Sequence, residues 1–558
     1  MKLIVSNHRK NKIRQVLQMT FFRFFRKTEN LIPLLMILMF ATLNLSSVRR
    51  EFSKTNDEDK HYLYGERIAS GDSTRFDDSK MPVTGLNALP KKIASFLDDG
   101  KIKQVLSRFY VARSVTILFS CLLAFLVFYW ARLLYGFIPA LFSLALYILD
   151  PNIIAHSQLV TTDLYVILAI CFAFFSLWKF LNNRTIGNGV ICMLALGLSQ
   201  VAKYTSIVLF PLFIILLFIF DAFAWKTISQ ERKSFGSMGR KYAQYGIYTL
   251  VVVILVINIG FLFNNTFTYF GEYNFISSVL KNIQSSLPML HGLPIPVPYP
   301  YLQGFDYMIS TEQTGNFSGN IYLLGQVSTL DGFPGYFFIA SLLKVPIATQ
   351  IVLLIAFIAY FSKKEFRKNL VKNEMFLLVP VLFFTIYFNF FFNTQVGIRY
   401  YLPVFPLLYI FAGNLFVGWK DFTFFQKASS YVAIIYLSIS VLSYYPYHIS
   451  YFNEIILDRK QAYKYLADSN IDWGQNKNEL DKYLLDHPDA LYKPSNIRSG
   501  HLIVRVNDLV GVTAEPEKYA WLRNNFEPTD TIAYSYLIYK ISPDEIENLC
   551  ASTDYCDR

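Results

Sequence analysis

Hydrophobic residues form long runs along this chain, and shorter polar segments separate them. A helix needs about twenty apolar residues to cross the roughly 30 Å hydrocarbon core of a bilayer. Eleven such runs lie near 31–47, 112–131, 135–150, 164–180, 186–202, 204–221, 246–263, 337–360, 375–392, 401–417 and 430–446. The pattern therefore predicts an all-α polytopic membrane protein with about 11 transmembrane helices.

Composition supports the same class. The chain has 558 residues, of which 53% are hydrophobic, 17% aromatic and only 16% charged, and its mean hydropathy is +0.33. These values exclude an ordinary soluble globular protein.

Charge in the loops predicts the topology. Residues 1–30 are basic and amphipathic and run into the first apolar run without a small-residue cleavage pattern, which predicts a cytoplasmic interfacial helix. With this end inside, the loops after the sixth and eighth runs are cytoplasmic, as the positive-inside rule requires. Their cations are Lys226, Arg232, Lys233, Arg240 and Lys241, and Lys363, Lys364, Arg367, Lys368 and Lys372. Anionic lipid explains much of the net charge of +12, so we expect no nucleic-acid partner.

The same parity places three segments outside. They are the loops 48–110 and 265–335 and the tail 447–558, which follows the transmembrane domain of residues 31–446. Two strand-like stretches, 501–512 and 531–541, flank a helical one, 514–526, and predict a small α/β region in the tail. Cys550 and Cys556 also lie in the tail, where an oxidising compartment allows a disulfide but a frayed terminus can keep them apart.

Ionisable residues gather on the predicted outer face. The segment TNDEDKHYLYG, residues 55–65, carries three consecutive acids, a pattern that alone is typical of a solvated loop. At membrane depth each charge costs about 2.5 to 3.5 kcal/mol and needs a reason. Each charged residue taken alone has an explanation without function; a lysine or arginine, for instance, can extend its charged end to the lipid headgroups. Their joint position favours a functional site, and the set comprises Asp57, Glu58, His61, Asp150, His156, Asp163, Lys203, Lys344 and Arg399, with Tyr204 and Tyr400 adjacent.

Carboxylates and fixed cations at one membrane surface suit a particular chemistry. A carboxylate can take a proton from an attacking hydroxyl, and cations can hold a phosphate leaving group. A sugar joined to a lipid phosphate would use both. The candidates are Asp57, Glu58 and Asp163 for catalysis, Lys203, Lys344 and Arg399 for the donor phosphate, and His61, His156, Tyr204 and Tyr400 for the sugar or acceptor pocket.

Nine short motifs then follow in a recognisable order. They are DEDKHYLYGERIASGDSTRF, SKMPVTGLNALP, DPNIIAHSQLVTTD, VAKYT, YLLGQVSTLDGFPGYF, LLKVP, GIRYYLPVFPLLYIFAG, YFNE and DSNIDWGQNKNEL. From about residue 30 to 540 the chain resembles the bacterial branch of the GT-C glycosyltransferases, phospholipid carrier-dependent enzymes related to protein O-mannosyltransferases and aminoarabinose transferase.

The resemblance implies a GT-C fold and a polyprenyl-phosphate sugar as donor. It also implies an extracytoplasmic active site in the bacterial inner membrane. The acceptor stays open among a protein hydroxyl, lipid A, and teichoic acid or another envelope glycan. Asp57 and Glu58 match the family's first acidic motif and Asp163 its second, while Lys203 and Arg399 match positions that we assign to the lipid phosphate.

Two features depart from many relatives. Asp59 stands where a Pro often follows the acidic pair, and Lys80, Met81 and Pro82 replace HPP. We therefore expect Asp59 to be dispensable, and donor or acceptor preference does not carry over. A divalent metal is a further alternative, because Asp57, Glu58 and Asp163 with nearby histidines offer oxygen and nitrogen ligands; the cofactor requirement stays open.

A membrane glycosyltransferase is the leading functional hypothesis. The main alternative is a transporter or flippase for a lipid-linked glycan, and an inactive structural relative is a third. Large outside loops with paired acids favour the enzyme, because transporters concentrate polar residues near the midplane of the membrane.

Overall fold

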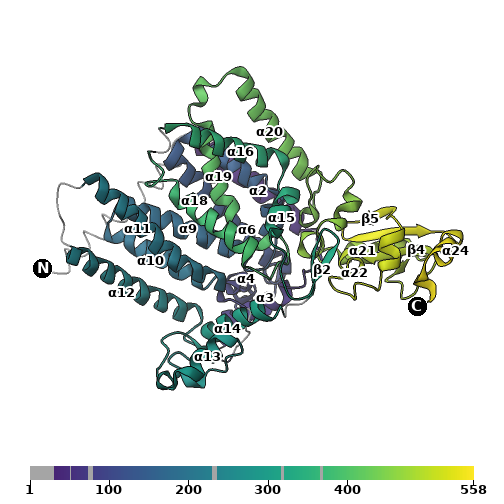
Figure 1. The fold of residues 1–558 in the computed structure, drawn as a ribbon, viewed down its shortest axis with the longest axis horizontal. Coiled ribbons are helices and arrows are strands. Elements are labelled where there is room, and N and C mark those ends of the chain that lie inside the picture. The colour runs from purple at the N-terminus through teal and green to yellow at the C-terminus, as the bar shows by residue number, and fades with distance from the viewer. Residues whose placement is uncertain are drawn as a thin grey trace.

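The computed structural model describes residues 30–50, 52–72, 74, 80–228, 235–315, 319–364 and 368–557. The interfacial helix expected over 1–30 lies outside these residues except for Asn30, as do Arg232, Lys233 and Arg367 of the basic loops. A large helical body carries a small α/β unit at one end, drawn in yellow in Figure 1.

All eleven predicted spans coincide with apolar helices or bent helix pairs in the described part of the chain. Six are long and apolar enough to cross a membrane individually. They belong to α2 (Leu31–Val48), α6 (Phe109–Tyr135), α9 (Asp163–Asn182), α11 (Leu209–Ile228) with the 3-10 turn η3 (Tyr204–Val208) before it, α12 (Phe235–Gly260) and α20 (Phe424–Leu442). Three others are shorter: α10 (Ile186–Gln200), α18 (Met375–Phe390), and α19 (Val404–Ala412) with η7 (Gly413–Phe416). The mostly helical, polytopic class is confirmed.

Two predicted spans are broken rather than continuous. The third consists of α7 (Phe137–Ile148) and α8 (Pro151–Ser157), which bend by 65°, and the eighth of α15 (Tyr336–Lys344) and α16 (Ile347–Ser362), which bend by 116°. Proline causes both breaks, since Pro151 begins α8 behind its N-cap Asp150 and Pro346 holds Val345 in an extended conformation. Hydropathy alone predicts one continuous span across such a break, because the residues on both sides of it are apolar.

Burial separates the centre of the helical body from its periphery. Leu123, Val127 and Trp130 of α6 are fully buried. By contrast, Leu255 of α12 and Val432 of α20 are 50% and 63% exposed. Exposed apolar side chains on long helices are expected where the helices contact lipid, so α12 and α20 lie at the lipid-facing edge.

The first predicted outside loop folds over the end of the body. It forms α3 (Glu58–Ser70), η2 (Pro82–Thr84), α4 (Gly85–Ala94) and α5 (Lys101–Leu106). Gly65 of α3 lies so close to Thr84 that an added Cβ would stand 2.4 Å from the Thr84 carbonyl oxygen. Asn87 donates to the backbone carbonyl of Ala112 over 2.8 Å, which ties α4 to α6.

The second loop predicted to lie outside contains mostly helices and turns. Its elements are η4 (Phe270–Glu272), α13 (Ser278–Ser286), η5 (Pro288–Leu290), α14 (Tyr299–Thr314) and the antiparallel pair β1 (Ile321–Leu323) and β2 (Gln326–Ser328). Short 3-10 turns then lead from the last apolar helix into the tail: η9 (His448–Ser450), η10 (Arg459–Lys464) and η11 (Asp468–Asn470).

The tail contains the predicted α/β region, built on a sheet of order β3-β4-β6-β5. β3 (Leu491–Tyr492) is parallel to β4 (Gly500–Arg505), and β6 (Tyr536–Ile541) is antiparallel to β4 and to β5 (Asp530–Ile532). Its helices are α21 (Lys477–Asp486), α22 (Val506–Leu509), α23 (Ala520–Asn525) and α24 (Pro543–Ser552). The strand expected over 501–512 ends at Arg505 because its partner there, Tyr536, is the first residue of β6, and the helix expected over 514–526 is only α23.

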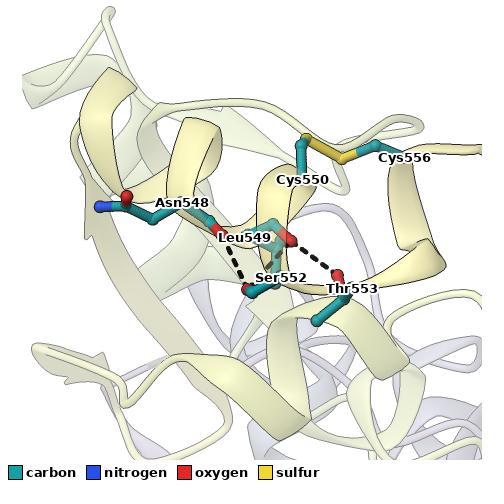
Figure 2. Close-up of a disulfide and its surroundings, with 6 residues drawn as sticks. All are labelled: Asn548, Leu549, Cys550, Ser552, Thr553 and Cys556. Atoms are coloured by element: carbon teal, nitrogen blue, oxygen red, sulfur yellow. Dashed lines mark hydrogen bonds between the residues drawn. A yellow bond between two sulfur atoms is a disulfide. The ribbon is translucent and has the colours of Figure 1, made fainter.

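A disulfide closes the end of the tail. Cys550 in α24 is bonded to Cys556 in the following 3-10 turn η12 (Asp554–Asp557), as Figure 2 shows. Ser552 and Thr553 donate hydrogen bonds to backbone carbonyls of α24, over 2.7 Å to Asn548 and 2.8 Å to Leu549. The structure therefore joins the two cysteines, one of the two alternatives open from the sequence.

Candidate active site

A cavity of about 550 Å³ lies where the helical body, the two long loops and the tail meet. Its lining includes Asp57 and His61 from the first loop, Asp163 at the start of α9, Lys203 and Tyr204, Arg399 and Tyr400 in η6 (Ile398–Tyr400), Glu312 in α14, and Asp468 and Trp473 of the tail. Its volume falls within the range of small-molecule sites.

Two acids and two cations alternate along one side of the cavity. The Arg399 Nη1 atom lies 3.0 Å from Oδ2 of Asp57 and 3.8 Å from Oδ2 of Asp163, and the Lys203 Nζ atom lies 2.7 Å from Oδ1 of Asp163. The Arg399 guanidinium stands over the Trp473 ring, 4.0 Å from its centre. Such a site can accept an anion at its cations and a proton at its free carboxylate oxygens.

Electrostatics keep the first acid charged and the neighbouring histidine neutral. Burial alone raises the pKa of Asp57, but the positive charges near it, that of Arg399 above all, outweigh this effect, so the pKa lies below its usual value. Burial, assisted by Lys80, lowers the pKa of His61 to about 3. At neutral pH the site therefore holds an ionised Asp57 beside an uncharged imidazole.

Glu58 follows Asp57 in the chain but does not line the cavity. Its carboxylate accepts two hydrogen bonds from Arg113 of α6, from Nε over 2.9 Å and from Nη2 over 2.6 Å. It also accepts the backbone N–H groups of Thr55 and Val160, each over 2.9 Å. Glu58 thus ties the first loop to α6 and to the turn before α9.

Lys344 and His156 also lie outside the lining. The Lys344 ammonium is buried and donates to the backbone carbonyls of Ile449 and Asn470, over 2.7 and 2.5 Å. The His156 ring is buried with its centre 6.0 Å from that of Trp473. These contacts fix the start of the tail against the body and differ from the phosphate and pocket contacts expected from the sequence.

The three proposed metal ligands do not converge. Within the described residues, no group of three or more His, Cys, Asp or Glu side chains is placed to hold a metal ion. Glu58 is bonded to Arg113, and Asp57 and Asp163 both face Arg399. The side chains at this site therefore do not fit a divalent cation.

Sequence reasoning assigned no role to several cavity residues. Lys80, Asp468 and Trp473 lie in the quoted motifs SKMPVTGLNALP and DSNIDWGQNKNEL, and Asn507 and Glu312 lie elsewhere. The two motifs identified the segments that contain the first three of these residues. Which side chain faces the cavity depends on turns such as η11, which the hydropathy pattern does not report.

A comparison with protein families supports the resemblance over part of the chain. Residues 105–257 match the family described as dolichyl-phosphate-mannose-protein mannosyltransferase. The matched segment contains Asp163 and Lys203 of the cavity and Arg113, the partner of Glu58. No curated protein matches the chain.

Among solved structures, the chain is similar to ArnT from Cupriavidus metallidurans bound to undecaprenyl phosphate, with 13% identity, a TM-score of 0.47, and coverage of 78% of this chain and 68% of that one. It is also similar to the apo oligosaccharyltransferase of Archaeoglobus fulgidus, with 14% identity, a TM-score of 0.49, and coverage of 82% and 58%. A further structure is the oligosaccharyltransferase AglB of that organism in complex with an inhibitory peptide and a dolichol-phosphate, with 13% identity, a TM-score of 0.45, and coverage of 78% and 56%. The chain spans little more than half the length of the two Archaeoglobus chains.

Proposed function

We propose that this protein is a membrane glycosyltransferase of the GT-C type, which transfers a sugar from a polyprenyl phosphate to an acceptor hydroxyl. The observation that carries the proposal is the alternation of Asp57, Arg399, Asp163 and Lys203 along one cavity. The family match supports it, because the matched segment contains Asp163 and Lys203. Nothing in the described residues favours the alternative of a flippase.

Each of these groups has a part in the transfer. The acceptor oxygen forms a bond to the anomeric carbon of the sugar while the bond from that carbon to the phosphate oxygen breaks. The electron pair of the broken bond leaves with the polyprenyl phosphate, whose charge Lys203 and Arg399 neutralise. The acceptor proton passes to Asp57, and Asp163 stabilises the positive charge that develops on the sugar ring.

Donor binding also activates the base in this scheme. Without donor, the guanidinium of Arg399 holds Asp57 ionised but lowers its pKa, which weakens it as a proton acceptor. A phosphate is a bidentate partner for arginine and competes with the carboxylate for it. Once Arg399 turns to the phosphate, Asp57 regains basicity where the acceptor arrives.

We place the cavity on the extracytoplasmic side of the bacterial inner membrane, because both five-cation loops fall on the opposite side by parity. The Cys550–Cys556 disulfide supports the same side, since such bonds persist in oxidising compartments. Membrane lipids and the lipid-linked sugar are the expected partners. The acceptor is a hydroxyl on a protein or an envelope glycan.

The test is donor consumption by purified protein in lipid nanodiscs, with a detergent extract of bacterial envelope as the source of acceptor. Polyprenyl-phosphate mannose, glucose and galactose are supplied in turn, and mass spectrometry follows release of the sugar-free lipid. Removing a positioned base slows turnover by about 100- to 10,000-fold, so we expect that loss from Asp57→Asn. Asp59→Asn is the matched control, because Asp59 is 60% exposed and pairs with Lys54. Undiminished turnover in Asp57→Asn would refute the assignment.

A further inference from the structure

Residues 468–475, which we call the strap, contact both loops that carry the charged pair of the cavity. The backbone N–H of Asn56, next to Asp57, donates to the carbonyl of Trp473 over 2.9 Å. The backbone N–H of Ile398, next to Arg399, donates to the side-chain oxygen of Asn470 over 3.0 Å. The strap therefore lies against the site from the side of the tail.

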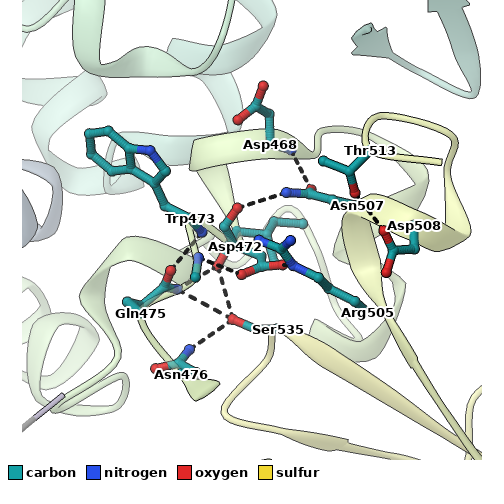
Figure 3. A network of polar contacts seen from close by, with 12 residues as sticks. Asp468, Asp472, Trp473, Gln475, Asn476, Arg505, Asn507, Asp508, Thr513 and Ser535 are labelled. Atoms are coloured by element: carbon teal, nitrogen blue, oxygen red, sulfur yellow. Dashed lines mark hydrogen bonds and ion pairs between the residues drawn. The ribbon is translucent and has the colours of Figure 1, made fainter. Parts of the chain in front are cut away.

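The α/β unit holds the strap in place, as Figure 3 shows. Asn507, which follows β4, accepts the backbone N–H of Asp468 and donates to the carbonyl of Asp472, each over 2.8 Å. Arg505 at the end of β4 forms an ion pair with Asp472, whose side chain is fully buried. These contacts fix the backbone at both ends of the 468–472 stretch.

Asp468 itself has an unusual backbone. Its φ angle of +56° lies in the left-handed region, which residues other than glycine adopt rarely and which is often found at functional sites. Its Oδ1 atom accepts the backbone N–H of Ser469 over 2.6 Å, and the residue lines the cavity. In Figure 3 the carboxylate points away from the Asp472–Arg505 network. One carboxylate oxygen thus holds the turn at Ser469, and the side chain also lines the cavity.

The carboxylate is retained at an electrostatic cost. Burial raises the pKa of Asp468 to about 6 although Arg399 acts in the opposite direction. No Lys, Arg or His nitrogen in the described part of the chain lies within 4.0 Å of its oxygens. A desolvated acid without an ion-pair partner contributes little to folding, so a ligand is the better explanation for its presence.

The neighbours of Asp468 indicate which part of a ligand it would meet. It lines the same cavity as Arg399, assigned above to the phosphate, and Asp57, assigned to the acceptor proton. In a lipid-linked sugar the ring lies between these two points. We propose that Asp468 binds hydroxyl groups of the transferred sugar, in a subsite that the strap presents to the cavity; this inference rests on the proposed function.

A comparison of two ligands tests the subsite. The first is the lipid-linked sugar that wild-type protein consumes, and the second is sugar-free polyprenyl phosphate as an inhibitor. Asn tolerates the left-handed backbone and keeps an acceptor for Ser469, so Asp468→Asn changes little except the charge. A hydrogen bond to a charged group accounts for about 10- to 100-fold in affinity, so we expect the donor KM to rise by at least about tenfold. The inhibition constant of the sugar-free lipid stays within about twofold.

Two more variants complete the design. Asp468→Gly preserves the backbone and removes the whole side chain, so it should show the same split between donor and inhibitor. Asp489→Asn is the control in the α/β unit, where this acid is 71% exposed and contacts His501. An unchanged donor KM in Asp468→Asn would overturn the inference. Equal loss of donor and sugar-free lipid would also overturn it, because it would show a structural role. If wild-type protein consumes no donor, the proposed function fails and this inference fails with it.

Discussion

Asp57 and Glu58 are adjacent in the chain, and each is paired with an arginine, but the two pairs lie in different surroundings. The Asp57 side chain is 32% exposed and contacts Arg399 in the wall of the cavity. The side chains of Glu58 and Arg113 are 0% and 3% exposed. The same chemical pair can therefore be available to a ligand or committed to the fold, and burial decides which.

Hydrogen bonding makes the difference sharper. Glu58 receives four hydrogen bonds, two from Arg113 and one each from Thr55 and Val160, so its acceptor sites are largely filled. Asp57 receives one from Arg399. A carboxylate with free acceptor sites can still bind a proton or a hydroxyl. Glu58 can affect catalysis only through the position of the loop that carries Asp57.

The largest expected effect would break the buried pair. Arg113→Met leaves the Glu58 carboxylate buried without its cation, and loss of one member of such a pair costs about 3 to 5 kcal/mol of stability. We expect the free energy of unfolding, measured in mixed detergent micelles, to fall by this amount. Arg399→Met, the matched change in the open pair, should shift it far less. Equal destabilisation by both substitutions would contradict the contrast between the two pairs.

A smaller effect concerns lipid affinity. Arg399→Ala removes a charge-assisted partner of the phosphate, so binding of sugar-free polyprenyl phosphate should weaken by about 10- to 100-fold. Arg399→Lys keeps the charge but loses the bidentate geometry, so its affinity for the lipid should lie between those of the wild-type protein and the alanine variant. Isothermal titration in nanodiscs measures both. Wild-type affinity in the alanine variant would remove Arg399 from the phosphate site.

An effect of similar size is a gain in stability that depends on pH. The pKa of Asp468 is raised from its usual 3.8 to about 6, so its contribution to stability is full below about pH 4 and is lost as pH rises through about 6. Asp468→Asn should therefore stabilise the protein by about 1 to 3 kcal/mol at pH 8 and hardly at all at pH 4. Thermal unfolding at the two pH values measures the difference. A loss of stability at pH 8 would mean that the carboxylate supports the fold.

Much of this protein follows from local pattern. The apolar runs predicted the helices, because a helix in lipid must be covered with apolar side chains whatever its neighbours are. Parity of the spans then placed Asp57, Asp163, Lys203 and Arg399 at one membrane face, and the structure brings all four into one cavity. The α/β character of the tail was also visible, because strand and helix periodicities differ.

Tertiary structure decided which groups each charged side chain contacts. No local signal distinguishes Glu58 from Asp57, or predicts that Lys344 binds the carbonyls of Ile449 and Asn470, which lie 105 and 126 residues away in the chain. The role of Asp468 depends on a left-handed turn held by Asn507 from another element. Hydropathy records whether a residue type tolerates water or lipid, whereas burial and pairing of a charged group depend on which distant segments pack around it. The sequence by itself therefore determined the helices and the face on which the charges gather, and only packing determined which charges remain free to act.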